Sequence, residues 1–114
     1  MLVKRFQDAK PYNAPNHFEC KALRLQGFEA GGPERCWVGL SHFLPGGGAG
    51  PDKSPLEKIY VVLSGEITVK ADGQDVILKS MDSCSIGPNI ERQIINGSNE
   101  VTSMLVIMPY PEEK

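Results

Sequence analysis

The sequence predicts an all-β domain, and three observations support this fold class. The 12 Gly and 9 Pro lie between short apolar runs, a pattern typical of strands joined by turns. The run from Glu66 to Lys70 alternates polar and apolar residues with a period of two, as a strand with one buried face does. No segment keeps helical apolar spacing over three turns, so no long helix is expected.

Three strands are expected in the first part of the chain: Leu2–Phe6, Phe18–Leu25 and Cys36–Leu44. Each is a short run rich in apolar residues. Turn-forming residues from Pro11 to Asn16 predict a loop between the first two strands. The third strand is expected to end at Leu44, before a glycine-rich stretch from Gly46 to Gly50.

Six further strands are expected: Lys58–Leu63, Glu66–Ala71, Gln74–Leu78, Ser83–Ile86, Glu91–Ile95 and Thr102–Met108. After its first residue Lys58–Leu63 is apolar on both faces, which predicts a central strand covered on both sides. Asp72-Gly73 supplies the two positive-φ residues of a tight hairpin, and Ser64-Gly65 makes a similar turn. Short strands at this spacing are typical of a sandwich or a jelly-roll barrel.

Composition predicts one globular domain over residues 1–114, because 40% of the residues are hydrophobic and 23% are charged. Within it we expect an N-terminal strand and loop (1–35), a core (about 36–108) and a tail (109–114). A net charge of −2 gives no basic surface for nucleic acid. No apolar run reaches the ~18 residues of a membrane span. Three cysteines without a C-x-x-C pair and the absence of a signal peptide predict a cytoplasmic protein with free thiols.

From Leu44 to Met108 the sequence resembles the cupin family. The first cupin motif opens with Pro-Gly, continues through a loop bearing two His and a Glu, and ends at a Gly six residues later. Here Leu44 to Gly47 opens the motif and Glu57 to Glu66 closes it. The second motif pairs a Pro with a later His and Asn, and here Asp82 to Pro88 leads to Arg92 and Asn96.

The resemblance implies a single-domain, RmlC-like jelly-roll barrel. It also implies a homodimer, formed by exchange of the N-terminal strand Leu2–Phe6.

The four metal-ligand positions of the family hold other residues here. Lys58 stands at the position of the motif's Glu, the loop Pro51 to Ser54 contains no His, and Arg92 stands at the position of the second motif's His. Lys and Arg bring positive charge and no usable lone pair, whereas a divalent cation requires imidazole and carboxylate donors. We therefore expect no metal and no other cofactor.

If Lys58 and Arg92 point into the barrel, as their family counterparts do, the cavity favours an anion. Arg92 would bind a carboxylate through two parallel hydrogen bonds. Repulsion from Arg92 would lower the pKa of Lys58 towards the range of proton transfer. Tyr60 lies two residues after Lys58, hence on the same face, and could donate a hydrogen bond or a proton. The structural alternative is that Lys58 pairs with Glu57 or Asp52 and Arg92 with Glu91.

The two histidines, His17 and His42, each precede a Phe in an expected strand. If both point inward, they form a general base or, with Glu57, an alternative metal site. Otherwise they are core or interface histidines. The alternation around His42 has apolar residues on both faces, so the sequence leaves its direction open.

The leading hypothesis is a metal-independent enzyme that acts on a small carboxylate or enolisable carbonyl compound by proton transfer, as an isomerase, cyclase or dehydratase. Lys58, Tyr60 and His42 are the candidate catalytic residues. The candidate substrate-binding residues are Arg92, Asp52, Ser54 and Glu57. One alternative is a non-catalytic cupin that binds a small molecule. Another is a metal-dependent cupin with a rebuilt site of His17, His42 and Glu57.

Overall fold

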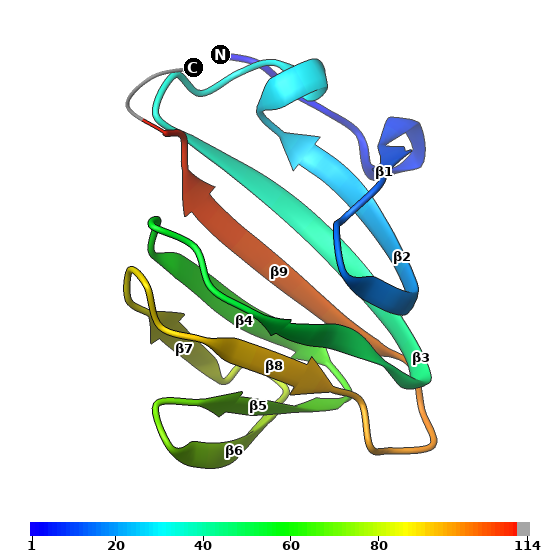
Figure 1. Ribbon diagram of the computed structural model, residues 1–114. Coiled ribbons are helices and arrows are strands. Elements are labelled where there is room, and N and C mark those ends of the chain that lie inside the picture. The colour runs from blue at the N-terminus through cyan, green and yellow to red at the C-terminus, as the bar shows by residue number, and fades with distance from the viewer. Residues whose placement is uncertain (112–114) are drawn as a thin grey trace.

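The computed structural model describes residues 1–111, and nearly all regular structure in them is β (Figure 1). The nine strands within this range pair antiparallel in one sheet, which confirms the predicted fold class. The elements in chain order are the 3-10 helix η1 (Phe6–Asp8), β1 (Lys10–Tyr12), β2 (His17–Gln26), the 3-10 helix η2 (Phe28–Ala30), β3 (Cys36–Asp52), β4 (Lys58–Ser64), β5 (Glu66–Ala71), β6 (Gln74–Lys79), β7 (Ser83–Ile86), β8 (Arg92–Ile95) and β9 (Thr102–Pro109).

The 17-residue strand β3 links the two layers of the nearly closed barrel. Its first half, Cys36–Phe43, lies between β2 and β9, and β4 and β7 continue this layer. Its second half pairs with β8, and β5 and β6 follow in the other layer. Figure 1 shows β3 running alongside β2 and β9, with β5, β6 and β8 gathered at one end.

The inward faces of the two layers form the hydrophobic core. Its fully buried side chains come from both layers and include Phe43, Val62, Ile67, Ile94 and Met104. Alternation along each strand puts every second residue into this core.

The segment expected as the first strand, Leu2–Phe6, is not a strand, so this prediction was wrong. The edge of β2 that it would occupy is taken by β1, in which Lys10 pairs with Arg24. Leu2 and Val3 are exposed, and the ring of Phe6 lies against His42 in an edge-on contact.

The glycine-rich stretch after Leu44 is part of β3, not a loop. Gly48 lies so close to β8 that a Cβ there would collide with the carbonyl oxygen of Ile94. A Cβ at Gly47 would likewise collide with the carbonyl oxygen of Glu19 in β2. The glycines therefore let three backbones pack at close range, which is why this stretch stays extended.

Strand β4 is buried on one face only, so the prediction that both faces are covered was wrong for residues 1–111. Lys58, Tyr60 and Val62 face inward, whereas Ile59 is 42% exposed and Leu63 is 38% exposed. Register and alternation place β4 in a continuous outward surface with β9 and β3. We call this surface the outer face; it consists of Val38, Leu40, His42, Ile59, Val61, Leu63, Ser103, Leu105 and Ile107.

The predicted hairpin turn is confirmed, because Asp72 and Gly73 have φ angles of 54° and 72°. Gly65 has a φ of 81°, but the tight hairpin expected at Ser64-Gly65 was wrong, because β4 pairs with β7 and β9 and β5 pairs with β6 and β8. Of the predicted tail, Pro109 ends β9, and residues 112–114 lie outside the described part of the chain.

Neither helical segment within residues 1–111 has the length and apolar character needed to cross a bilayer.

Candidate functional site

A cavity of about 340 Å³ lies inside the barrel, between β2, β3, β4, β8 and β9. We call it the barrel cavity. It contains both of the cations that the sequence singled out, Lys58 and Arg92. Its lining is Tyr12, Asn13, Ala14, Pro15, His17, Arg24, Phe28, Trp37, Ser41, Asp52, Ser54, Lys58, Tyr60, Arg92, Met104, Val106 and Met108.

Lys58 is a buried residue whose ammonium group has no partner. Its exposed fraction is 6%, and within residues 1–111 no hydrogen bond or ion pair engages its Nζ. Every fully buried side-chain nitrogen or oxygen in this range has a partner, so Nζ must reach the open space of the cavity. Burial, followed by the nearby charge of Arg92, lowers the pKa of Lys58, and Asp52 partly offsets this effect.

Arg92, in contrast, is held in place by hydrogen bonds. Its exposed fraction is 5%. Its Nε donates to the Tyr60 hydroxyl at 2.7 Å, and its Nη1 donates to the Gly50 carbonyl at 2.9 Å. A guanidinium carries five N–H groups, so the others remain for a ligand. The expected pairing of Arg92 with Glu91 is absent from the described residues.

Tyr60 remains protonated and has its own proton to offer. Burial raises the pKa of its phenol, although the neighbouring Arg92 opposes this shift. Because the hydroxyl oxygen accepts from Arg92 Nε, the Tyr60 O–H can donate to a ligand.

His17 lies in the barrel cavity with its tautomer fixed. Its Nδ1 donates to the Pro15 carbonyl at 2.7 Å, and its ring stacks on Phe43 with centroids 6.1 Å apart. Burial lowers the pKa of His17, and the charges of Arg92 and Lys58 lower it further. A neutral imidazole with a proton on Nδ1 has a lone pair on Nε2, which can act as a base.

The structure does not bring His42 into this cavity. In β3 the inward residues include Trp37, Ser41 and Phe43, so His42 points to the outer face. There its Nδ1 lies 2.8 Å from the Ser103 hydroxyl.

Of the three candidate residues in or next to the loop before β4, two line the barrel cavity and one does not. Asp52 and Ser54 line the barrel cavity, where Asp52 accepts a hydrogen bond from the Lys53 amide and Ser54 from the Leu56 amide. Glu57 is exposed and outside the lining, and it does not pair with Lys58.

The rebuilt metal site of His17, His42 and Glu57 is not assembled, because the two histidines lie on opposite faces of the sheet. Among residues 1–111 no three His, Cys, Asp or Glu side chains are grouped to hold an ion. The donor set of the cavity, with two buried cations beside one imidazole and one carboxylate, does not fit a divalent metal.

Sequence reasoning missed Arg24 and the aromatic residues around it. The Arg24 guanidinium carbon lies 3.7 Å from the ring centroid of Tyr12, 4.4 Å from that of Phe28 and 4.7 Å from that of Trp37. Arg24 Nε also donates to Glu29 at 3.2 Å. The available signal was the alternation of β2, which puts Arg24 on the same face as the buried Ala22.

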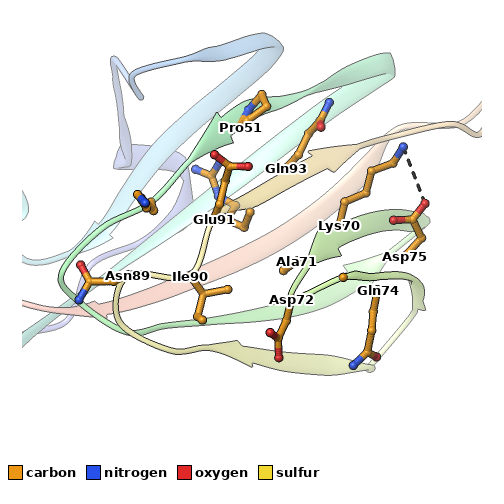
Figure 2. A pocket seen from close by; sticks show the side chains of 13 residues that line it. Pro51, Lys70, Ala71, Asp72, Gln74, Asp75, Asn89, Ile90, Glu91 and Gln93 are labelled. Atoms are coloured by element: carbon orange, nitrogen blue, oxygen red, sulfur yellow. Dashed lines mark ion pairs between the residues drawn. The ribbon is translucent and has the colours of Figure 1, made fainter.

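A second, larger cavity of about 450 Å³ lies over the β5–β6 hairpin and β8 (Figure 2). Figure 2 shows Lys70 and Asp75 at this cavity, joined as an ion pair at 3.8 Å. Lys70, Asp75 and Glu91 are exposed, so water solvates their charges. Apart from Arg92, which lines both cavities, no buried charge lies here. The buried charged side chains are therefore concentrated in the barrel cavity.

Comparison with known proteins places this geometry in a family. A cupin-domain model matches residues 39–108. A Mycobacterium tuberculosis protein named beta-D-galactosidase is 41% identical over 111 residues, covering 97% of this chain and 96% of that protein.

Two solved structures share the fold. The polyketide cyclase RemF from Streptomyces resistomycificus has a TM-score of 0.85 at 18% identity, covering 100% of this chain and 82% of that one. An RmlC-like cupin from Shewanella frigidimarina has a TM-score of 0.79 at 15% identity, covering 97% of this chain and 92% of that one. The family model matches more than half of the chain and shows that the chain belongs to the cupin family.

Proposed function

We propose that this cupin is an enzyme that moves a proton on a small carboxylate or enolisable carbonyl compound, without a metal ion. The observation that carries the proposal is the unpartnered ammonium of the buried residue Lys58, which lines the same cavity as the hydrogen-bonded guanidinium of Arg92. A buried charge without a partner costs free energy. A bound anion removes this cost, so the cavity favours negatively charged ligands.

The protonation state of each side chain indicates the role that we propose for it. Lys58 and the free N–H groups of Arg92 hold the anionic group of the ligand and the oxygen on which charge develops. His17, neutral and with a free Nε2, removes the proton next to the carbonyl carbon. The C–H electron pair forms a C=C bond, and the C=O π electrons move to the oxygen, which becomes an enolate.

Tyr60 donates its proton or a hydrogen bond to that enolate oxygen. Return of the proton from His17 to a different atom completes an isomerisation. In a dehydration the enolate re-forms its C=O bond, the electrons of the C=C bond form a new double bond to the β-carbon, and the hydroxyl group on that carbon takes the proton from His17 and leaves as water. In this scheme His17 replaces His42 as the candidate base, because His17 lines the cavity and His42 does not.

Hydrogen–deuterium exchange tests the proposal. In D₂O we expect the protein to accelerate loss of the C3 proton signal of 2-oxobutyrate or phenylpyruvate, followed by NMR. His17→Gln and Lys58→Met should each slow this exchange at least about tenfold. Lys53→Met, which removes an exposed ammonium outside the barrel cavity, is the matched control. If these compounds bind but exchange at the rate of buffer, the protein is a non-catalytic binding cupin and the enzyme proposal fails.

Hydrolysis of a β-galactoside is a second candidate, favoured by the name of the 41% identical relative. Most glycosidases place two carboxylates across the scissile bond. Among the described residues that line the barrel cavity, Asp52 is the only one with a carboxylate. Asp52 would then act with His17 or Tyr60. Release of nitrophenol from nitrophenyl β-galactoside, abolished in Asp52→Asn, would favour this candidate over proton transfer.

We also propose that the protein forms a homodimer through the outer face. None of the nine residues of this face is Asp, Glu, Lys or Arg. The neighbouring N-terminal segment adds exposed apolar side chains, with Leu2 48% exposed and Phe6 61% exposed. Within the face, Ile59 is 42% and Leu63 is 38% exposed, whereas Leu40 is already buried at 6%. Exposed apolar surface of this kind is covered in most soluble proteins, and a second copy presents the same surface in return.

A further inference from the structure

The barrel cavity has two unlike halves. The polar half contains Lys58, Tyr60 and Arg92, from β4 and β8. The other half is apolar except for Arg24 and begins at β9, where Met104, Val106 and Met108 alternate along one face. Most of the cavity wall is therefore not needed to bind an anionic group.

The strand register places the apolar half directly beside the polar half. Val106 is paired with Tyr60 on β4 and with Gly39 on β3, while Met108 is paired with Trp37. The β9 side chains therefore form a floor that runs from the Tyr60 hydroxyl towards the indole of Trp37.

An aromatic wall of Tyr12, Phe28 and Trp37 lies at the far side of this floor. The rings of Tyr12 and Phe28 lie 6.1 Å and 5.7 Å from that of Trp37, measured between centroids. All three rings contact the guanidinium of Arg24. The ion pair of Arg24 with Glu29 at 3.2 Å and these cation–π contacts satisfy its charge. Arg24 therefore lies at the centre of the wall with partners for its charge, whereas the ammonium of Lys58 has none.

Gly39 lies in close contact with this wall and with the β9 floor, where a larger residue would not fit. A Cβ at this position would lie 2.7 Å from the Tyr12 hydroxyl oxygen, 3.0 Å from the Trp37 ring and 3.1 Å from Val106. The glycine therefore allows the tyrosine and the tryptophan to approach the floor. Rings held in this way lose little conformational entropy when a flat ligand contacts them.

We infer that the ligand is an amphipathic carboxylate, in which a ring or a similarly sized apolar group is attached to the anionic group. This inference rests on the proposed anion site and adds the apolar body to it. The carboxylate binds Lys58 and Arg92, and the ring lies on the β9 floor against Trp37. A carboxylate without such a body fills only the polar half of the cavity.

Calorimetric titration with three probes tests this inference. Phenylacetate has both parts, acetate has the charge alone, and phenylacetamide has the ring without the charge. Phenylacetate should bind at least about tenfold more tightly than either of the others. Acetate binding is measured by its displacement of phenylacetate. Trp37 is the only tryptophan of the chain, so its fluorescence should change with phenylacetate at the same midpoint.

Two variants separate the halves, and thermal melting verifies that each is folded. Trp37→Leu should weaken phenylacetate severalfold and leave acetate unchanged. Lys58→Met should weaken both carboxylates and leave phenylacetamide unchanged, with Lys53→Met as the control. Equal affinities for phenylacetate and acetate, or no binding of phenylacetate, would overturn the amphipathic ligand. Equal affinities for phenylacetate and phenylacetamide would instead overturn the anion site and the proposed function with it.

Discussion

Lys58 and Arg92 are both buried cations, but their surroundings give them opposite effects on stability. Arg92 donates to Tyr60 and to the Gly50 carbonyl, so its charge is used within the fold. Lys58 has no such partner in the described chain, and burial lowers its pKa. The free energy of unfolding therefore contains a penalty at Lys58 that a ligand can remove.

Replacing Lys58 should therefore stabilise the protein. We expect Lys58→Met to raise the free energy of unfolding by about 1 kcal/mol at neutral pH, since a buried unpaired charge gives way to an apolar side chain. The folded-state pKa of Lys58 is lowered, so the penalty is fully present below that pKa. It disappears as pH rises towards the unfolded value of ~10.5.

Urea unfolding at neutral and alkaline pH measures this difference. The gain of Lys58→Met over the native chain should shrink as pH rises. Arg92→Leu provides the contrast: it should destabilise by about 2–3 kcal/mol, because it leaves Tyr60 and the Gly50 carbonyl without their donor. A destabilised Lys58→Met would contradict our account of an unpartnered ammonium.

At the scale of elements, β3 determines how the barrel closes. Its first half belongs to the layer of β2 and β9, and its glycine-rich second half approaches β8 and β2 at close range. This crossing places Gly50 and Asp52 beside Arg92. The glycines of β3 thus act on the site as well as on the fold.

Gly48→Ala should be strongly destabilising, by about 2–4 kcal/mol. Its Cβ would collide with the carbonyl of Ile94, and a backbone carbonyl within a strand cannot move away as a flexible side chain can. Gly97→Ala is the matched control, since no atom lies within 4 Å of a Cβ at that position. Its stability should change by no more than about 0.5 kcal/mol. Thermal melting of the two variants compares them, and equal melting temperatures would show that β3 and β8 can separate without cost.

At the scale of the whole molecule, the outer face predicts association. The native chain should have twice the mass of one chain in size-exclusion chromatography with light scattering. Ile59→Lys places a charge in the outer face and should yield monomers, since charges are depleted in interface cores. Ile77→Lys, at a 53% exposed position on β6, should leave the dimer intact. A monomeric native chain would contradict the proposed pairing.

Local patterns predicted much of the fold. Strands β5 and β7 have the predicted bounds, since alternation and turn residues are encoded within a few positions. The first strand was predicted wrongly: Leu2–Phe6 forms no strand, and β1 pairs with Ala22 to Arg24 of β2 instead. The apolar residues of Leu2–Phe6 alone do not reveal which segment pairs with β2.

The sequence by itself determined the fold class and the family resemblance, and it singled out Lys58 and Arg92 as candidate site residues. The direction of each histidine was decided only by the tertiary structure. A period of two tells which residues share a face, but both faces of β3 carry apolar residues, so only the pairing with β2 and β9 shows that His42 points outward. The same long-range pairing brings His17 to Lys58 and Arg92, and surrounds Arg24 with rings from three separate segments.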